Sequence, residues 1–270
     1  MRNWWFLFCP LLLASCYEPR EGCLDIEATN FDAAADKNCC CTYPALKLTF
    51  LPRFDTLVWK PDTAYQYAPG KWFRIKQAVF YLSDFQLLQQ GAPARISDSL
   101  EFSLLGPAGD TVRQTLINDF QLIRRTVIDY TAGAFRPGGT FESIRFRVGL
   151  PASAQRVIPD LAPDGHPLRR QAEGMWQGPD TGYVALKLVI TRDSLPGTAP
   201  DTLWFSRPDF DSAVIQKDAI FRHESGYDFR LQLQVDFREL FRSVDLSTGD
   251  ISAWKTQIIA NLPGAFSVFP

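Results

Sequence analysis

Apolar and polar residues alternate with a period of two along several segments after Ala45. The clearest segment runs from Phe229 to Phe237, where Phe, Leu, Leu, Val and Phe share one side and Arg, Gln, Gln and Asp share the other. Residues 46–50, 141–148 and 184–190 show the same pattern. Such alternation places one face of a strand on a core and the other face in water. The chain is therefore predicted to form many half-buried strands.

Turn signals and a single clear helix complete the predicted fold. Turn-forming residues separate the strand patterns at 92–93, 107–109, 137–139 and 196–197. A helix is expected from Asp250, which can cap it, to about Asn261, with Pro263-Gly264 as the stop. A second short turn is expected at 239–242. The prediction is an all-β fold, an antiparallel β-sandwich with one or two short helices near the C-terminus.

The first sixteen residues have the features of an export signal. Arg2 gives a positive start, an uncharged apolar run of Trp4 to Ala14 follows, and that run is too short to span a bilayer. The ending Leu13-Ala14-Ser15-Cys16 resembles the lipobox of bacterial lipoproteins, which implies a lipid on Cys16 and attachment to the membrane. The alternative is an ordinary secretory signal with Cys16 as a plain thiol. We expect residues 1–15 to be removed and the protein to be an outer-membrane lipoprotein of the cell envelope, on either the periplasmic or the surface face.

Composition excludes some partners. The chain has 46% hydrophobic and 21% charged residues, with a formal net charge of −2. These values are typical of a globular protein and give no basic patch for nucleic acid. We therefore expect no nucleic-acid partner.

Four cysteines mark a small unit ahead of the sandwich. After the signal and a spacer at 16–22, the cysteines lie within residues 23–43, at Cys23, Cys39, Cys40 and Cys41. In an exported chain they are disulfide candidates, and their pairing is open. The same unit contains Asp25, Asp32 and Asp36, which could supply oxygen ligands to calcium; solvated loop acids are the alternative.

Four later segments together resemble a known family. They are FRIKQAVFYLSDFQLL at 73–88, FESIRFRVGLP at 141–151, GMWQGPDTGYVALKL at 174–188 and FRHESG at 221–226. In this order they look like the MbnP-like copper-binding domain, which is often found in lipoproteins of Bacteroidota. The resemblance covers residues 45–270. It implies a β-sandwich with a mononuclear copper site built from histidines beside an oxidised tryptophan, and a copper-delivery or redox partner protein.

The family positions map onto this chain only in part. His223 matches the histidine of the Phe-x-His-x-x-Gly segment, whereas Gln177 and Pro179 occupy positions where the family has tryptophan and a second ligand. Trp176 lies one position before the place where the family has its tryptophan. The chain has two histidines, so His166, in a turn-like loop shortly before Gly174, is the other candidate ligand. A copper site normally requires at least two imidazoles, and His166 and His223 could meet if both loops open at one end of the sandwich.

Enzyme motifs are missing from the sequence. His223-Glu224 has no second histidine at zincin spacing, and there is no Gly-x-Ser-x-Gly elbow, phosphate loop or Rossmann glycine pattern. We therefore predict a non-enzymatic binding protein that binds or handles copper. The alternative is a metal-free module that binds a glycan or an envelope protein.

Overall fold

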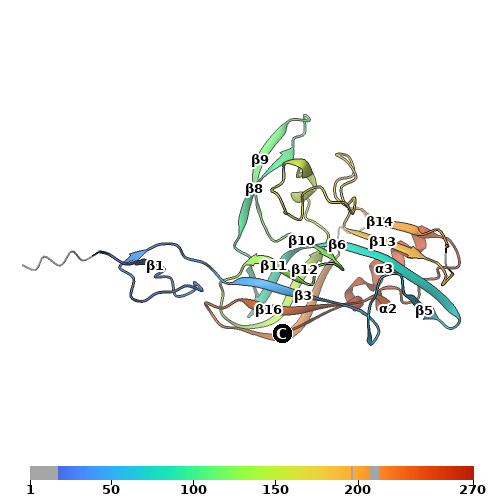
Figure 1. The fold of residues 1–270 in the computed structure, drawn as a ribbon, viewed down its shortest axis with the longest axis horizontal. Coiled ribbons are helices and arrows are strands. Elements are labelled where there is room, and N and C mark those ends of the chain that lie inside the picture. The colour runs from blue at the N-terminus through green and yellow to red at the C-terminus, as the bar shows by residue number, and fades with distance from the viewer. Residues whose placement is uncertain (1–17, 196, 207–212) are drawn as a thin grey trace, which may run out of the picture.

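Two β-sheets built from the alternating segments form the body of the protein (Figure 1). The structure, a computed structural model, describes residues 18–195, 197–206 and 213–270; the predicted signal segment and Cys16 lie outside these ranges. Within them, the larger sheet has eight strands and the smaller sheet has five. The predicted all-β fold is confirmed.

The larger sheet is organised around one long strand, β6. Its main path runs β14-β13-β6-β12-β15, and three short strands pair with further parts of β6. All its pairings are antiparallel. The strands are β5 (Ala64–Ala68), β6 (Lys71–Gln89), β7 (Ala92–Arg95), β10 (Gln121–Arg124), β12 (Gly139–Val148), β13 (Leu186–Thr191), β14 (Asp201–Phe205) and β15 (Val214–His223).

The smaller sheet corrects one detail of the prediction. Its path is β11-β3-β16-β17, and β4 pairs with β3. The neighbours β3 and β16 run parallel, so the sandwich is not purely antiparallel. A parallel pair needs a long crossover, and here the whole larger sheet lies between the two strands in sequence. The strands are β3 (Ala45–Phe54), β4 (Leu57–Val58), β11 (Asp129–Ala134), β16 (Phe229–Asp236) and β17 (Phe266–Phe269).

Aromatic side chains fill the space between the two sheets. Phe80 of β6 makes edge contacts with Phe50 of β3, at 5.9 Å between ring centroids, and with Phe266 of β17, at 5.8 Å. Phe141 and Phe146 of β12 are fully buried in the same core. Such rings bury large apolar areas and prefer edge-on or offset contacts. Truncating one of them to alanine typically costs about 3–5 kcal/mol.

The C-terminal helices match the predicted start but not the predicted stop. The side chain of Asp250 accepts a hydrogen bond from the Ala253 amide at 3.0 Å and caps α3 (Ile251–Ala265), as predicted. The predicted stop at Pro263 is wrong, because α3 continues to Ala265. Leu262 and Ala265 are buried, so packing against the core carries the last turn past the proline. The short turn expected at 239–242 is α2 (Phe237–Leu240).

A second, smaller hydrophobic cluster lies against the other face of β6. Val79 and Tyr81 point into it, together with side chains from the hairpin of β8 (Ser99–Leu105) and β9 (Thr111–Ile117). The hairpin projects from the body beside the segment that carries the short 3₁₀ helices Ala154–Arg156 and Pro159–Leu161 (Figure 1). We call this part, residues 99–120 and 150–184, the lobe.

Within the described ranges, no helix is long and apolar enough to cross a bilayer.

The cysteine-rich unit forms an extension at one end of the body (Figure 1). It contains β1 (Glu21–Gly22) and β2 (Lys37–Asn38), and a disulfide joins Cys23 to Cys41 with 4.9 Å between their Cα atoms. Of the four disulfide candidates, Cys23 and Cys41 are joined, whereas Cys39 and Cys40 are free thiols. Cys39 and Cys40 are neighbours in the sequence, so their Cα atoms are only about 3.8 Å apart. This distance is shorter than the ~4.4–6.8 Å that disulfides favour, so a bond between these two cysteines is unfavourable.

Candidate functional site

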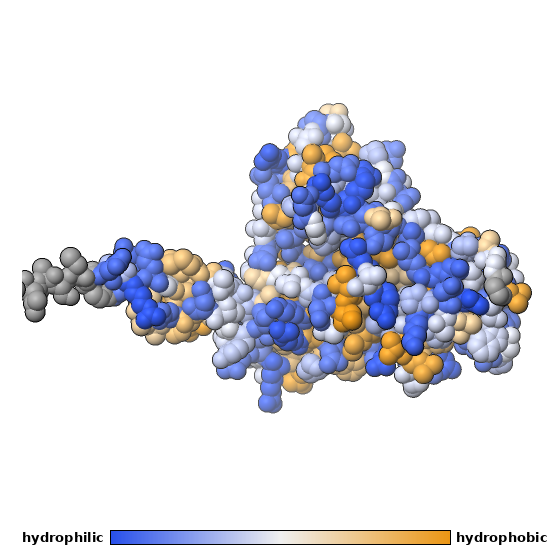
Figure 2. Space-filling view, in the orientation of Figure 1, coloured by the Kyte–Doolittle hydropathy of each residue, from blue (hydrophilic) through white to orange (hydrophobic). Residues whose placement is uncertain are grey.

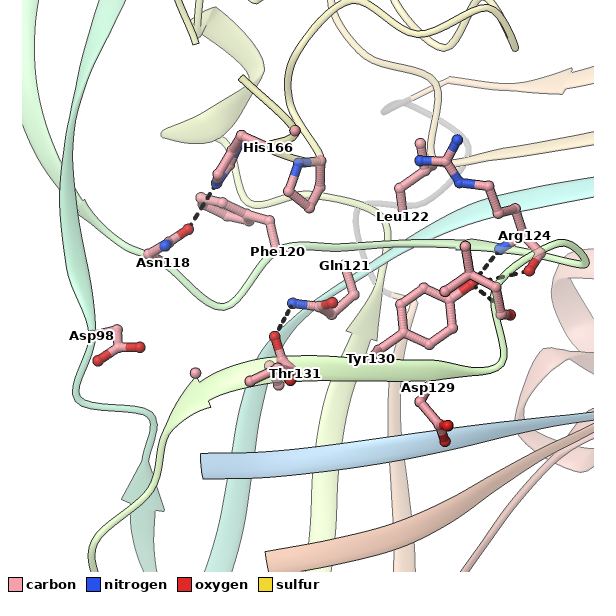
Figure 3. Close-up of a pocket in the computed structure, with 15 residues that line it drawn as sticks. Asp98, Asn118, Phe120, Gln121, Leu122, Arg124, Asp129, Tyr130, Thr131 and His166 are labelled. Atoms are coloured by element: carbon pink, nitrogen blue, oxygen red, sulfur yellow. Dashed lines mark hydrogen bonds between the residues drawn. The ribbon is translucent and has the colours of Figure 1, made fainter. Parts of the chain in front are cut away.

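A groove of about 370 Å³ opens where β10 and β11 face the loop that carries His166 (Figure 3). This volume lies within the usual range of small-molecule sites. Phe120, Leu122 and Pro167 supply apolar walls. Its polar lining consists of Asp98, Asn118, Gln121, Arg124, Asp129, Tyr130, Thr131 and His166.

Two buried tyrosines fix the loop that forms one wall of the groove. The hydroxyl of Tyr81, on β6, donates to the Pro167 carbonyl at 3.1 Å, and the hydroxyl of Tyr183 donates to the Leu168 carbonyl at 2.6 Å. Burial raises the pKa of both phenols well above the ordinary value, so both stay protonated donors. The two rings also meet edge to face at 5.8 Å. The position of the loop therefore depends on the core of the lobe.

His166 is held as a neutral ring. Its Nδ1 accepts a hydrogen bond from the Leu168 amide at 3.1 Å, so the proton is on Nε2, which donates to Oδ1 of Asn118 at 2.8 Å. Burial lowers the pKa of His166 to about 4. The ring packs edge-on against Phe102, with 5.1 Å between centroids. At neutral pH this histidine contributes hydrogen bonds and no charge.

Arg124 and Tyr130 close the far end of the groove. The Tyr130 hydroxyl accepts from the Arg124 amide at 2.8 Å, and it lies within 3.1 Å of the carbonyls of Arg124 and Val127. Burial raises the pKa of Tyr130 to about 12. The Arg124 guanidinium pairs with Glu173 at 2.8 Å, which neutralises the one Arg or Lys among the described residues that line the groove.

Three polar groups in the groove have no protein partner in the described ranges. They are the amide NH₂ of Asn118, the amide oxygen of Gln121 and the hydroxyl of Thr131. The other half of the Gln121 amide is fixed, because its Nε2 donates to the Thr131 carbonyl at 2.9 Å. The groove thus presents both donors and acceptors that are already oriented (Figure 3).

His223, the other predicted ligand, lies in the main core. It is 7% exposed and stacks on Phe229 with 4.8 Å between ring centroids. Its Nδ1 and Nε2 each lie 2.7 Å from a carbonyl oxygen, those of Pro137 and Tyr227. Because carbonyls only accept hydrogen bonds, the ring makes both bonds only when both nitrogens carry protons.

The structure does not bring the two histidines together. His166 lies in the lobe against Phe120, a member of the hydrophobic cluster that also contains Tyr183, and Trp176 packs on Tyr183 at 4.9 Å between ring centroids. His223 contacts Phe135 and Phe229 of the main core. In the part of the chain that the structure describes, no group of three or more His, Cys, Asp or Glu residues could hold a metal ion. Of the two divergent family positions, Gln177 donates to the Gly174 carbonyl at 2.6 Å and Pro179 is exposed.

Each of the three acids proposed for calcium has a protein partner within the small unit. Asp25 accepts from the Tyr43 hydroxyl at 3.0 Å, whereas Asp32 pairs with Arg20 at 2.9 Å. Asp36 accepts from the Arg20 amide at 2.9 Å. Each carboxylate thus stabilises the fold of the small unit, and the three do not converge on one point.

The comparisons with known proteins give a distant structural similarity. No family model matches the chain, and no curated protein matches it. Among solved structures, MbnP from Methylosinus trichosporium matches with a TM-score of 0.45 and 14% sequence identity, over 75% of this chain and 78% of that chain. Membership of the MbnP-like family stays a prediction.

Asp119 is a buried acid directly behind the groove. It lies between the groove residues Asn118 and Phe120, is 4% exposed, and accepts a hydrogen bond from the Phe85 amide of β6 at 3.0 Å. Burial raises its pKa from 3.8 to about 7. The folded protein therefore holds this proton more tightly than the unfolded chain does.

This acid predicts a pH dependence of stability. The contribution of the protonated Asp119 is complete below about pH 4 and is lost as pH rises to about 7, because the folded protein must then bury a charge. Asp119→Asn keeps an acceptor for Phe85 and carries no charge. It should match the wild type at pH 4 and exceed its unfolding free energy at pH 8, by up to about 4 kcal/mol. Urea unfolding across this range measures the difference, with the exposed Asp180→Asn as control. The account is contradicted if the unfolding free energy of Asp119→Asn changes with pH in the same way as that of the wild type.

Proposed function

We propose that this chain is a cell-envelope binding protein whose groove takes a neutral, hydroxyl-rich ligand such as an envelope glycan. The observation that carries the proposal is the set of partnerless groups on Asn118, Gln121 and Thr131, gathered in one groove with oriented amides. Sugar hydroxyls both donate and accept, so they can satisfy an NH₂, a carbonyl and a hydroxyl at once. This role needs binding and no catalytic group.

The electrostatics of the groove favour a neutral ligand. His166 carries no charge at neutral pH, and Arg124 is paired with Glu173. The remaining charged residues are acids, Asp98 and Asp129, and both already accept hydrogen bonds, from the Ala134 amide and the Thr49 hydroxyl. An anionic ligand would lack a free cation here and would meet two carboxylates.

Binding to immobilised envelope glycans tests this role. Asn118→Ala removes the free NH₂ and the acceptor of His166, and it should weaken saturable glycan binding at least tenfold. Gln114→Ala, on the exposed face of the β8–β9 hairpin, is the matched control and should bind like the wild type. Equal binding by Asn118→Ala and wild type, or no saturable binding to any envelope glycan, would overturn the proposal.

We further propose that Cys16 tethers the protein to the membrane. The lipobox-like ending supports this, as does the position of the cysteine-rich unit, which extends away from the body (Figure 1). Hydrophilic residues cover much of the face seen in Figure 2, as suits a body held in water beside a membrane. In the native host, Cys16→Ser should move the protein from the membrane fraction to the soluble fraction. If this variant stays in the membrane fraction, the anchor is not on Cys16.

Copper is the second candidate ligand, and the state of His166 favours it. Neutral imidazole is the form that binds copper, and His166 is neutral beside a groove that also contains Asp98. To bind copper through Nε2, the ring would have to give up its hydrogen bond to Asn118 and move its proton to Nδ1, which would break the hydrogen bond from the Leu168 amide. With one equivalent of Cu(II), electron paramagnetic resonance should then show a nitrogen-coordinated signal that His166→Ala abolishes and His223→Ala retains. The copper candidate fails if the signal is absent or survives His166→Ala.

A further inference from the structure

A second hollow shares Arg124 with the groove. It has a volume of about 200 Å³ and lies between β6 and the turn that follows β10. Side chains that line it include Trp59, Lys76, Arg124, Arg125 and Glu173. The groove and this hollow share Arg124, and their other side chains differ.

Buried polar atoms without partners gather around this hollow. In the described ranges, the Nε1 of Trp59, the Nε of Arg124 and the Nε of Arg125 have no hydrogen-bond partner, and neither does Oε2 of Glu173. Trp59 is only 1% exposed, so bulk water does not satisfy its N–H group. Native proteins rarely leave buried polar groups unpaired. The three unpaired donors around this hollow outnumber the one unpaired acceptor, so they point to an acceptor that binds there.

The charges around the hollow are unbalanced toward positive. Arg124 pairs with Glu173 at 2.8 Å, and Lys76 pairs with the half-exposed Asp62 at 3.5 Å. Arg125 is half-buried and makes no ion pair with any described residue. A guanidinium that is kept partly out of water without a counter-ion favours an anion beside it.

We infer that this hollow binds a small oxyanion, a carboxylate or a phosphate, with Arg125 as its charged anchor and the Trp59 N–H as a second donor. Arginine recognises carboxylate and phosphate through paired N–H groups, and charge-assisted hydrogen bonds of this kind are the strong ones. The volume corresponds to about seven water molecules, which admits a free oxyanion or the acidic end of a larger molecule. Neither Arg125 nor Trp59 lines the proposed glycan groove.

Nuclear magnetic resonance titration of the indole N–H signals tests the inference. Inorganic phosphate and acetate are added separately at constant ionic strength, with sodium chloride as the reference. At least one oxyanion should shift the assigned Trp59 indole signal saturably. A response to phosphate or to acetate then shows which of the two oxyanion classes the hollow binds. If neither shifts this signal beyond chloride, the inference is overturned.

Substitutions at Arg125 locate the anchor. Arg125→Gln should weaken binding of the oxyanion at least tenfold, whereas Arg125→Lys, which keeps the charge but loses the paired N–H groups, should weaken binding less. Arg95→Gln, at an exposed arginine on β7, is the matched control. The Trp59 signal reports whether each variant is folded. If Arg125→Gln is folded and binds like the wild type, Arg125 is not the anchor and the proposal fails.

Discussion

The burial of β6 on both faces is the constraint on which the rest of the structure depends. Phe80 and Leu82 point into the core between the two sheets, whereas Val79 and Tyr81 point into the cluster of the lobe. A strand buried on both sides is an almost continuous apolar run. A shift of its pairing register by one residue would move every side chain of the strand to the opposite face, so both cores fix the register. Because Tyr81 also holds the Pro167 carbonyl, the wall of the groove is attached to the same strand.

The groove is therefore formed at the seam between the sandwich and the lobe. Asp119 ties the chain behind the groove to the Phe85 amide of β6, beside Asp84, which has a left-handed φ of 55°. Asp119 thus attaches Asn118 and Phe120, which line the groove together with His166, to β6. The two histidine rings are held in separate places by their own hydrogen bonds, His166 in the lobe and His223 in the main core.

Sequence reasoning predicted the elements whose pattern is local. The alternation at 229–237 and 141–148 became β16 and β12, and Asp250 caps α3 as expected. It could not predict the groove, because Asn118, Gln121 and Thr131 carry no motif and come together only through the packing of the lobe. The two histidines looked like a pair because they are the only two in the chain, yet topology separates them. Likewise, the sequence left the pairing of the four cysteines open, and the structure joins Cys23 to Cys41.

The most direct test of this account is the hydrogen exchange of the Leu168 amide, which donates to Nδ1 of His166. Replacing Tyr81 and Tyr183 with Phe keeps both rings in the lobe and removes the two hydroxyls that hold the loop. The account predicts that protection of the Leu168 amide falls at least tenfold in this double variant, while amides in β16, such as Leu231 and Leu233, keep their protection. Unchanged protection at Leu168 would contradict the claim that the core of the lobe positions the groove.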